Sequence, residues 1–200
     1  MAPYDEKLDR LLGAAAKVFA RKGYHPTTMR DLARATGMSL AGIYHYVSGK
    51  DELLYLIQHR SLGAVLDGAK QITNSTSTDG QSQLAKFIEH HITFFASHMS
   101  EMKVLSHDVE SLDGERFANI QVLKKEYVDL LTSVIQKTDP EANIDPNVAT
   151  YALFGMMNWI YTWYDPKGSV SPEKLANDFT RLFLEGLTCS THPALSAGGR

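Results

Sequence analysis

TMRDLARATGMSLAGIYHYVSGK, residues 28–50, is the stretch that decides how the first part of this chain folds. Two short helices that cross steeply need a small residue at the crossing, a turn residue that tolerates positive φ, and a branched apolar residue in the small core. Ala33, Gly37 and Ile43 supply these three types at the offsets of four and ten that this geometry requires. The stretch is therefore predicted to form a helix-turn-helix, whose second helix can enter the major groove of DNA.

The outer face of the second helix in this motif is expected to contact DNA. Small residues let the helix backbone approach base edges closely, and the tyrosine and histidine tips suit phosphates. Thr28 and Lys50 each begin a helix, where the helix dipole favours a phosphate. Alternatively, Tyr44 and Tyr46 merely pack on neighbouring helices. The predicted DNA-contact residues are Thr28, Arg30, Ser39, Leu40, Ala41, Gly42, Tyr44, His45, Tyr46 and Lys50.

Apolar residues recur at three- and four-residue spacing along nearly the whole chain, which predicts an all-α fold of about nine helices. Polar stretches at 74–80 and 138–146 are expected to be loops. We expect a DNA-binding domain at 1–50, a ligand-binding and dimerisation domain at 51–188, and a mobile tail at 189–200. Outside the 28–50 motif, helices are expected at 4–22, from about 50 to 72, and at 81–99, 101–109, 115–137, 147–164 and 172–188.

Two of these stretches, 147–164 and 175–187, carry apolar residues on nearly every side. A helix that is apolar all round must be buried all round. Burial against a second copy of the chain is the favoured interpretation, so we expect a homodimer through 147–164 and 172–188. A central core helix in a monomer is the alternative.

Composition excludes several classes of protein. Among the 200 residues, 44% are hydrophobic and 22% charged, which is typical of a globular protein and not of a disordered chain. A lone cysteine, Cys189, fits a reducing compartment, and no apolar run is long enough to span a membrane. Residues 1–12 lack the apolar core of an export signal, so a cytoplasmic location is expected.

Charge is distributed unevenly between the two parts of the chain. The first 60 residues hold 9 Lys and Arg against 6 Asp and Glu, whereas the remaining residues hold 11 against 17. A basic first part suits a polyanionic partner, although this excess is small.

The segment AAAKVFARKGYHPTTMRDLARATGMSLAGIYHYVSGKDELL (Ala14–Leu54) strongly resembles the DNA-binding domain of TetR-family transcriptional repressors. Val47 departs from the family pattern, because many members have phenylalanine there. The resemblance implies a second, helical domain that binds a ligand and dimerises through its last two helices. The matching residues are Phe19, Gly23, Tyr24, Thr28, Leu32, Ala33, Gly37, Ser39, Tyr44, Lys50 and Leu53.

The segment GMMNWIYTWYDPKG (Gly155–Gly168) is similar to the FadR- and KstR-like branch of that family, whose members respond to acyl-CoA thioesters. In that resemblance the aromatic turn joins the last two helices. Trp159 and Trp163 lie four residues apart, on one face of the expected helix, where they either pack in a dimer core or form a wall of the ligand site.

A ligand pocket is expected between the central helices. Methionines suit a flexible apolar ligand because they repack easily, although plain core packing remains the alternative for each candidate. Phosphates of an acyl-CoA need cations, for which Lys103, Arg116, Lys124 and Lys125 are available unless they form an ordinary solvated face. The candidate ligand contacts are His91, Phe94, Phe95, Met99, Met102, Leu105, Phe117, Tyr127, Phe154 and Trp159.

Neither a metal site nor a cofactor is expected. His91 and His98 are seven residues apart, about 10 Å along a helix axis, which one zinc ion does not span. No nucleophile elbow or phosphate-binding glycine loop is present, and Asp108 and Glu110 beside His107 diverge on a helix. We therefore expect a ligand-responsive repressor that binds a palindromic operator and is not an enzyme. A helical enzyme or carrier acting on an apolar or acyl-CoA ligand is the alternative.

Overall fold

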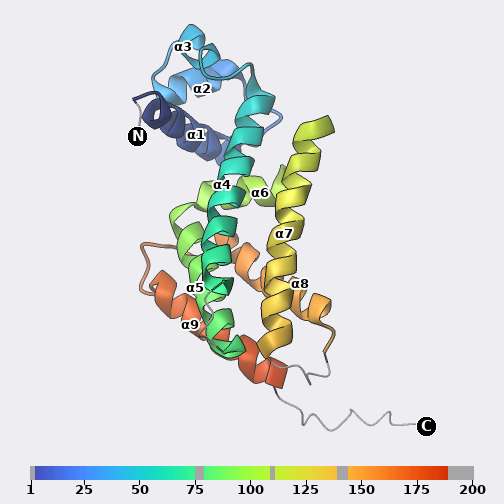
Figure 1. Cartoon of the computed structure of the whole chain (residues 1–200). Helices are drawn as coiled ribbons and strands as arrows, with labels where there is room; N and C mark the ends of the chain where they lie inside the picture. The colour runs from blue at the N-terminus through green and yellow to red at the C-terminus, as the bar shows by residue number, and fades with distance from the viewer. Residues whose placement is uncertain (1–2, 75–78, 109–110, 139–143, 189–200) are drawn as a thin grey trace, which may run out of the picture.

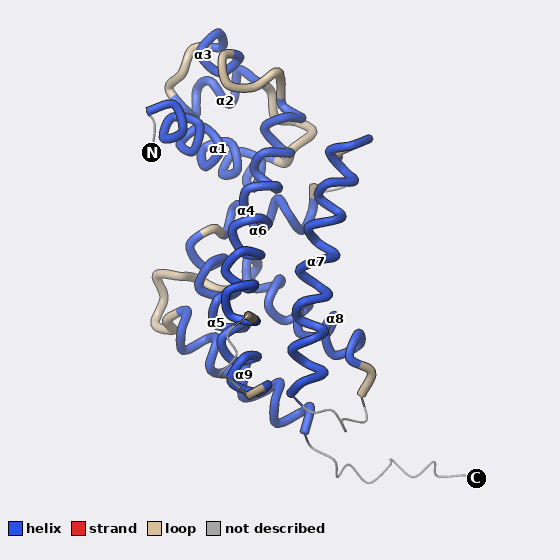
Figure 2. Tube along the Cα trace, in the orientation of Figure 1, coloured by secondary structure: helices blue, strands red, loops and turns tan. Residues whose placement is uncertain are grey.

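The structure, a computed structural model, describes residues 3–74, 79–108, 111–138 and 144–188. All regular secondary structure within these residues is helical, as the sequence predicted (Figures 1 and 2). The elements are α1 (Pro3–Lys22), α2 (Met29–Thr36), α3 (Leu40–Tyr44), α4 (Lys50–Thr73), α5 (Gly80–Ser97), α6 (Met99–His107), α7 (Gly114–Thr138), α8 (Pro146–Asn158), the 3-10 helix η2 (Trp159–Thr162) and α9 (Pro172–Thr188).

Local signals delimit the helices of the 28–50 motif. Thr28 caps α2, and its side chain and backbone both pair with Asp31 in a capping box. Gly37 ends α2 with φ 69°, a left-handed conformation that favours glycine. Ser39 then caps α3 by accepting a hydrogen bond from the Gly42 amide at 3.0 Å. The chain therefore turns between α2 and α3 as predicted.

Helix α4 connects the α1–α3 end of the molecule to the remaining helices (Figure 1). It packs on α1 near its start and on α5 and α7 further along, while α9 lies against α5. Helix α6 contacts α1 on one side and α4 and η2 on others, so it lies between the two ends of the molecule. None of the described helices combines the length and the apolar character needed to cross a membrane.

The prediction of one helix over 147–164 is wrong at its C-terminal end. α8 stops at Asn158, and the next turn tightens into η2, as helix ends often do. Ile160, which is fully buried, anchors this turn, and the Tyr164 amide donates to its carbonyl oxygen at 2.9 Å. Residues 165–168 then form a tight turn, in which the Gly168 amide donates to the Asp165 carbonyl at 2.9 Å.

Helix α9 is amphipathic, which corrects the expectation that 175–187 is apolar on every side. One face is buried, and the other carries the ion pairs Lys174–Asp178 and Arg181–Glu185. Within a single chain, α8, η2, the following turn and α9 also leave large apolar side chains in solvent. These residues, which we call the α8–α9 apolar face, are Val148, Tyr151, Trp159, Trp163 and Leu182, each between 56 and 64% exposed.

Candidate functional site

The α2–α3 end exposes most of the predicted DNA-contact residues. Leu32 and Ile43 are fully buried and hold α2 and α3 together, which leaves the opposite side of α3 in solvent. Tyr44 is 52% exposed, whereas Tyr46 packs partly against the core, as one alternative for it predicted. The exposed members of the predicted set are Thr28, Arg30, Ser39, Leu40, Ala41, Tyr44 and His45, and the half-buried members are Gly42, Tyr46 and Lys50.

Charge at the start of α2 is organised around Asp31. Its carboxylate accepts hydrogen bonds from the Lys22 ammonium at 2.5 Å, from the Thr28 backbone amide at 2.9 Å and from the Arg34 guanidinium at 2.7 Å. These contacts, the Lys22 hydrogen bond first, hold the pKa of Asp31 far below its usual value. The beginning of α2 is therefore fixed in place by residues from α1 and from α2 itself.

Lys50, predicted as a phosphate contact, also has a structural role. Its ammonium donates to the carbonyl oxygens of Tyr24 at 2.9 Å and His25 at 3.1 Å, and it lies 4.2 Å from the centre of the Tyr24 ring. The Tyr24 hydroxyl in turn donates to the Asp51 carboxylate. Burial and this carboxylate together raise the pKa of Tyr24. Lys50 thus ties the start of α4 to the loop between α1 and α2.

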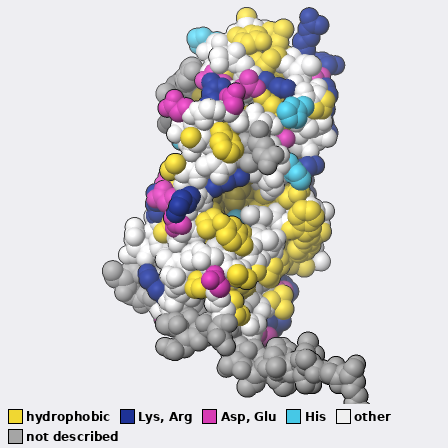
Figure 3. Space-filling view, turned by 90° about the vertical axis from the view of Figure 1, so that its right-hand side faces the viewer, with side chains coloured by type: hydrophobic (Ala, Val, Ile, Leu, Met, Phe, Trp, Pro, Cys, Tyr) yellow, Lys and Arg dark blue, Asp and Glu magenta, His cyan; other side chains and the backbone are white. Residues whose placement is uncertain are grey.

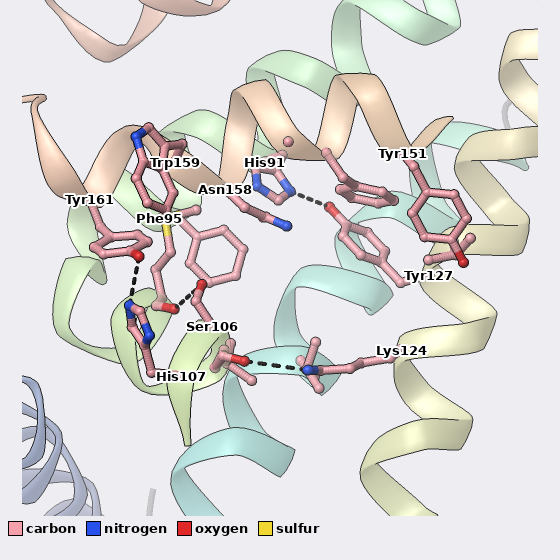
Figure 4. Close-up of a pocket in the computed structure, with 16 residues that line it drawn as sticks. His91, Phe95, Ser106, His107, Lys124, Tyr127, Tyr151, Asn158, Trp159 and Tyr161 are labelled. Atoms are coloured by element: carbon pink, nitrogen blue, oxygen red, sulfur yellow. Dashed lines mark hydrogen bonds between the residues drawn. The ribbon is translucent and has the colours of Figure 1, made fainter. Parts of the chain in front are cut away.

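A cavity of about 490 Å³ lies among the central helices (Figure 4). In the space-filling view, hydrophobic side chains gather around a hollow below the α1–α3 end (Figure 3). The cavity is lined by Leu62, His91, Phe95, Met102, Leu105, Ser106, His107, Lys124, Tyr127, Val128, Tyr151, Phe154, Gly155, Asn158, Trp159 and Tyr161.

Seven of the ten predicted ligand contacts line this cavity: His91, Phe95, Met102, Leu105, Tyr127, Phe154 and Trp159. Residues three or four apart share a helix face, which explains why several residues of one helix line the cavity together. On α8, Tyr151 and Asn158 lie three before and four after Phe154 and so belong to its face. Neither residue is among the candidate ligand contacts, although the spacing from Phe154 places both on the same helix face.

Phe94, Met99 and Phe117 do not line the cavity. Phe94 is the neighbour of Phe95, so it lies about 100° around α5 and lines a separate cavity between α1, α4 and α5 instead. Met99 is the first residue of α6 and packs partly against the core. Phe117 lies ten residues before Tyr127 on α7, about 15 Å towards the α1–α3 end, and is 36% exposed.

Aromatic rings form the deep wall of the cavity. The ring of His91 stacks on that of Tyr127 with centroids 5.9 Å apart, and His91 Nδ1 lies 3.0 Å from the Tyr127 hydroxyl. Phe154 packs against both rings, at 5.9 Å from His91 and 5.4 Å from Tyr127. Burial, followed by the charge of His90, lowers the pKa of His91 to about 3, and the nearby Asn158 side chain offsets only part of this shift. His91 is therefore neutral at physiological pH.

Polar groups lie at other positions on the cavity wall. Lys124 donates to the Leu105 carbonyl at 3.3 Å, and burial lowers its pKa. His107 Nε2 lies 2.7 Å from the Tyr161 hydroxyl, which joins α6 to η2 (Figure 4). Among the other cations proposed for phosphates, Lys125 pairs with Asp129 at 2.6 Å. The cavity is thus mainly apolar, with few polar groups at defined places.

His98 and Asp108, two candidates for other chemistry, do not line this cavity. Within the described residues, no group of three or more His, Cys, Asp and Glu side chains is arranged to hold a metal ion. His98 Nδ1 lies 2.7 Å from the Phe94 carbonyl of its own helix. Asp108 is half-buried, which raises its pKa, and Glu110 lies outside the described residues.

Comparison with known families matches both parts of the chain. Residues 11–55 match the family described as bacterial regulatory proteins, tetR family. Residues 77–187, more than half of the chain, match the family described as tetracyclin repressor-like, C-terminal domain.

Individual relatives agree over nearly the full length. The transcriptional repressor KstR2 of Rhodococcus jostii (strain RHA1) is 25% identical over 182 residues, which cover 88% of this chain and 89% of the relative. The crystal structure of a TetR-family regulator from Bordetella parapertussis 12822 is similar with a TM-score of 0.84 and 26% identity, covering 89% of this chain and 94% of that one. AibR in complex with isovaleryl coenzyme A and operator DNA is similar with a TM-score of 0.77 and 26% identity, covering 88% and 97%.

Proposed function

Because this chain belongs to the TetR family of bacterial regulatory proteins, we propose that it represses transcription as a homodimer on operator DNA and that an acyl-CoA thioester releases it. We assign residues 1–50 to DNA binding and residues 51–188 to ligand binding and dimerisation. The predicted tail, 189–200, lies outside the described residues. A repressor of this kind acts in the cytoplasm, has no enzymatic role, and needs no cofactor.

The DNA part of the proposal rests on the exposed side of α3. Ala41 has a small side chain and Gly42 has none, so the α3 backbone is free to approach base edges in the major groove. The exposed Tyr44 hydroxyl and the exposed Arg30 on α2 suit phosphate contacts, which position the protein without reading sequence. The capping box fixes the α2 terminus and so supports the orientation of α3.

Dimerisation is assigned to the α8–α9 apolar face. Five large apolar side chains more than half exposed on adjoining elements are unusual for a monomer surface and typical of an interface. Substituting Trp163→Glu and Leu182→Lys together is expected to convert the dimer into a monomer in sedimentation experiments. The matched control Val122→Lys, on the exposed side of α7, is expected to leave the dimer intact. A dimeric double variant would overturn this assignment.

The cavity is the observation that carries the ligand part of the proposal. Its volume of about 490 Å³ lies within the range of small-molecule sites, and its wall is mostly apolar and aromatic. AibR, which has a similar fold, is described in complex with isovaleryl coenzyme A and operator DNA. An acyl chain suits the apolar wall, and Lys124 provides a cation on that wall for the polar part of such a ligand.

Helix α6 provides a physical connection between ligand and DNA. Met102 and Leu105 on α6 line the cavity, and the same helix packs against α1 of the DNA-binding end. A ligand that binds one position of α6 more tightly than another shifts the population towards that position. We propose that the favoured position moves the two α3 helices of the dimer out of register with successive major grooves.

Fluorescence anisotropy tests the proposal directly. A labelled duplex from the DNA upstream of the gene is titrated with protein at fixed salt, with and without octanoyl-CoA. We expect a complex on this duplex, no complex of similar affinity on a shuffled duplex, and dissociation by octanoyl-CoA but not by coenzyme A alone. Failure to bind the upstream duplex in preference to the shuffled one would overturn the repressor proposal. A complex unaffected by octanoyl-CoA would overturn only its acyl-CoA part.

A further inference from the structure

His91 places a polar nitrogen at the deep wall of the apolar cavity. The side chain is 1% exposed, and its Nε2 atom has no hydrogen-bond partner within the described part of the chain. A buried polar atom without a partner costs free energy, so such atoms in proteins call for a specific explanation. Tyr127 aside, the labelled polar side chain nearest to His91 in Figure 4 is Asn158, whose interaction raises the pKa of His91 without making a hydrogen bond of normal geometry to Nε2.

The hydrogen-bond partner of Nδ1 determines whether Nε2 carries the proton of the imidazole. The Tyr127 hydroxyl lies 3.0 Å from Nδ1 and is itself buried, with a pKa that burial raises well above its usual value, so it keeps its proton. If Nδ1 carried the imidazole proton, the Tyr127 proton would have no acceptor there. The tautomer in which Tyr127 donates to Nδ1 uses both groups, and it leaves the proton of the neutral imidazole on Nε2.

The surroundings of Nε2 select the kind of acceptor. The Phe95 ring lies 4.8 Å from the His91 ring and Phe154 lies 5.9 Å from it, so this part of the cavity is apolar. The imidazole carries no charge that would compensate a buried anion. Lys124, the cation on the described cavity wall, lies away from His91 in Figure 4, where it donates to the Leu105 carbonyl. An uncharged acceptor fits these surroundings better than a carboxylate does.

We propose that the Nε2–H group of His91 donates a hydrogen bond to the neutral carbonyl oxygen of the bound acyl group, the thioester carbonyl in an acyl-CoA. This inference rests on the proposed function and adds an attachment point within the ligand. The acyl chain then lies along the aromatic wall, and Tyr127 acts as a positioning residue that holds the His91 tautomer.

A matched pair of probes tests the hydrogen bond. Octanoyl-CoA is compared with S-octyl-CoA, in which a methylene replaces the carbonyl and the rest of the molecule is unchanged. The dissociation constants are measured by calorimetry on the full-length protein. Because one hydrogen bond is removed from a buried donor, the wild-type protein is expected to bind octanoyl-CoA about tenfold more tightly.

Two substitutions of the same type provide the control. His91→Phe is expected to reduce the preference for the thioester to less than about twofold. His98→Phe, on the same segment but outside this cavity, is expected to retain the wild-type preference. Equal affinities for both probes in the wild-type protein, or a preference retained by His91→Phe, would overturn the inference and leave the proposed function intact. Binding of neither probe would overturn the acyl-CoA proposal and the inference with it.

Infrared spectroscopy keeps the test decisive if His91→Phe does not fold. The stretch of a ¹³C-labelled thioester carbonyl bound to the wild-type protein is expected at a lower wavenumber than that of the same thioester in an alkane solvent. His91→Gln, which retains an uncharged N–H donor, is expected to keep part of this displacement. A bound carbonyl that absorbs as it does in the alkane would overturn the inference.

Discussion

The DNA-facing end and the cavity differ in how far apart in the sequence their determining residues lie. The caps and the turn of the α2–α3 unit come from residues 28–50 alone. The cavity wall draws on α4 to α8 and η2, between Leu62 and Tyr161. The first site therefore depends on local backbone chemistry and tight packing, whereas the second depends on the register of distant helices and on space left unfilled. The predictions below test this difference, beginning with the largest expected effect.

Leucine-to-alanine substitutions are expected to lower the free energy of unfolding by different amounts in the two regions. Leu32→Ala removes a fully buried side chain between α2 and its neighbours and is expected to lower the free energy of unfolding by about 4 kcal/mol. Leu105→Ala, whose side chain already faces the cavity, is expected to cost only about 2 kcal/mol, because fewer contacts are lost. Urea unfolding at one fixed protein concentration measures both values. Equal losses would contradict the contrast in packing.

Acid is expected to destabilise the cavity region through His91. Its pKa is lowered to about 3 in the folded protein, while the unfolded chain titrates near 6.5. Between these values the unfolded state binds the additional proton, so stability falls as the pH decreases from 6.5 towards 3, by up to about 1.4 kcal/mol per pH unit. His91→Gln removes this contribution. Its unfolding free energy, measured across the same pH range, is expected to fall less steeply than that of the wild type, and parallel profiles would count against a buried neutral His91.

Two glycines are expected to respond with opposite signs. Gly37→Ala places a side chain at φ 69°, which is expected to cost about 1 to 2 kcal/mol. Gly63→Ala lies inside α4, where an added Cβ meets nothing within 4 Å, and is expected to gain about 0.5 to 1 kcal/mol. Thermal and urea unfolding of the two variants would show the difference. A gain at Gly37 would contradict the strain assigned to the turn.

The smallest effect concerns Lys50, which we propose as a phosphate contact in addition to its structural role. Lys50→Met is expected to weaken binding to all duplexes similarly and to flatten the salt dependence by about one ion. It also removes the hydrogen bonds to Tyr24 and His25, so a modest loss of stability is expected. Tyr44→Phe provides the comparison, with weaker binding but an unchanged salt slope. An unchanged slope in Lys50→Met would restrict Lys50 to its structural role.

Sequence alone predicted the helical fold and the α2–α3 unit well, because the signals there are local. The α2 cap, the glycine that ends α2 and the α3 cap each depend on a residue type at one position. The end of α8 was predicted less well, since the change to η2 depends on how Ile160 is buried by distant residues. Boundaries set by tertiary packing leave little trace in the spacing of apolar residues.

The cavity could be predicted only in part. Seven of the ten candidate ligand contacts line the cavity and three do not, because a core position and a cavity position draw on the same residue types. Phe94 and Phe95 are identical in type and adjacent, and only the orientation of α5 separates the cavities that they line. Conversely, Tyr151 and Asn158 share a helix face with Phe154, so a strict search at spacings of three and four would have included them.

Trp159 has a practical consequence for optical work on this protein. It lines the cavity and is 60% exposed, while Trp163, the other tryptophan of the chain, lies outside the cavity with its ring centroid 6.4 Å from that of Phe179. Intrinsic emission therefore arises from two indoles with different environments. Replacing Trp163 with phenylalanine would leave Trp159 as the single tryptophan, at the cavity wall, so that occupancy could be followed by selective indole excitation without an attached dye.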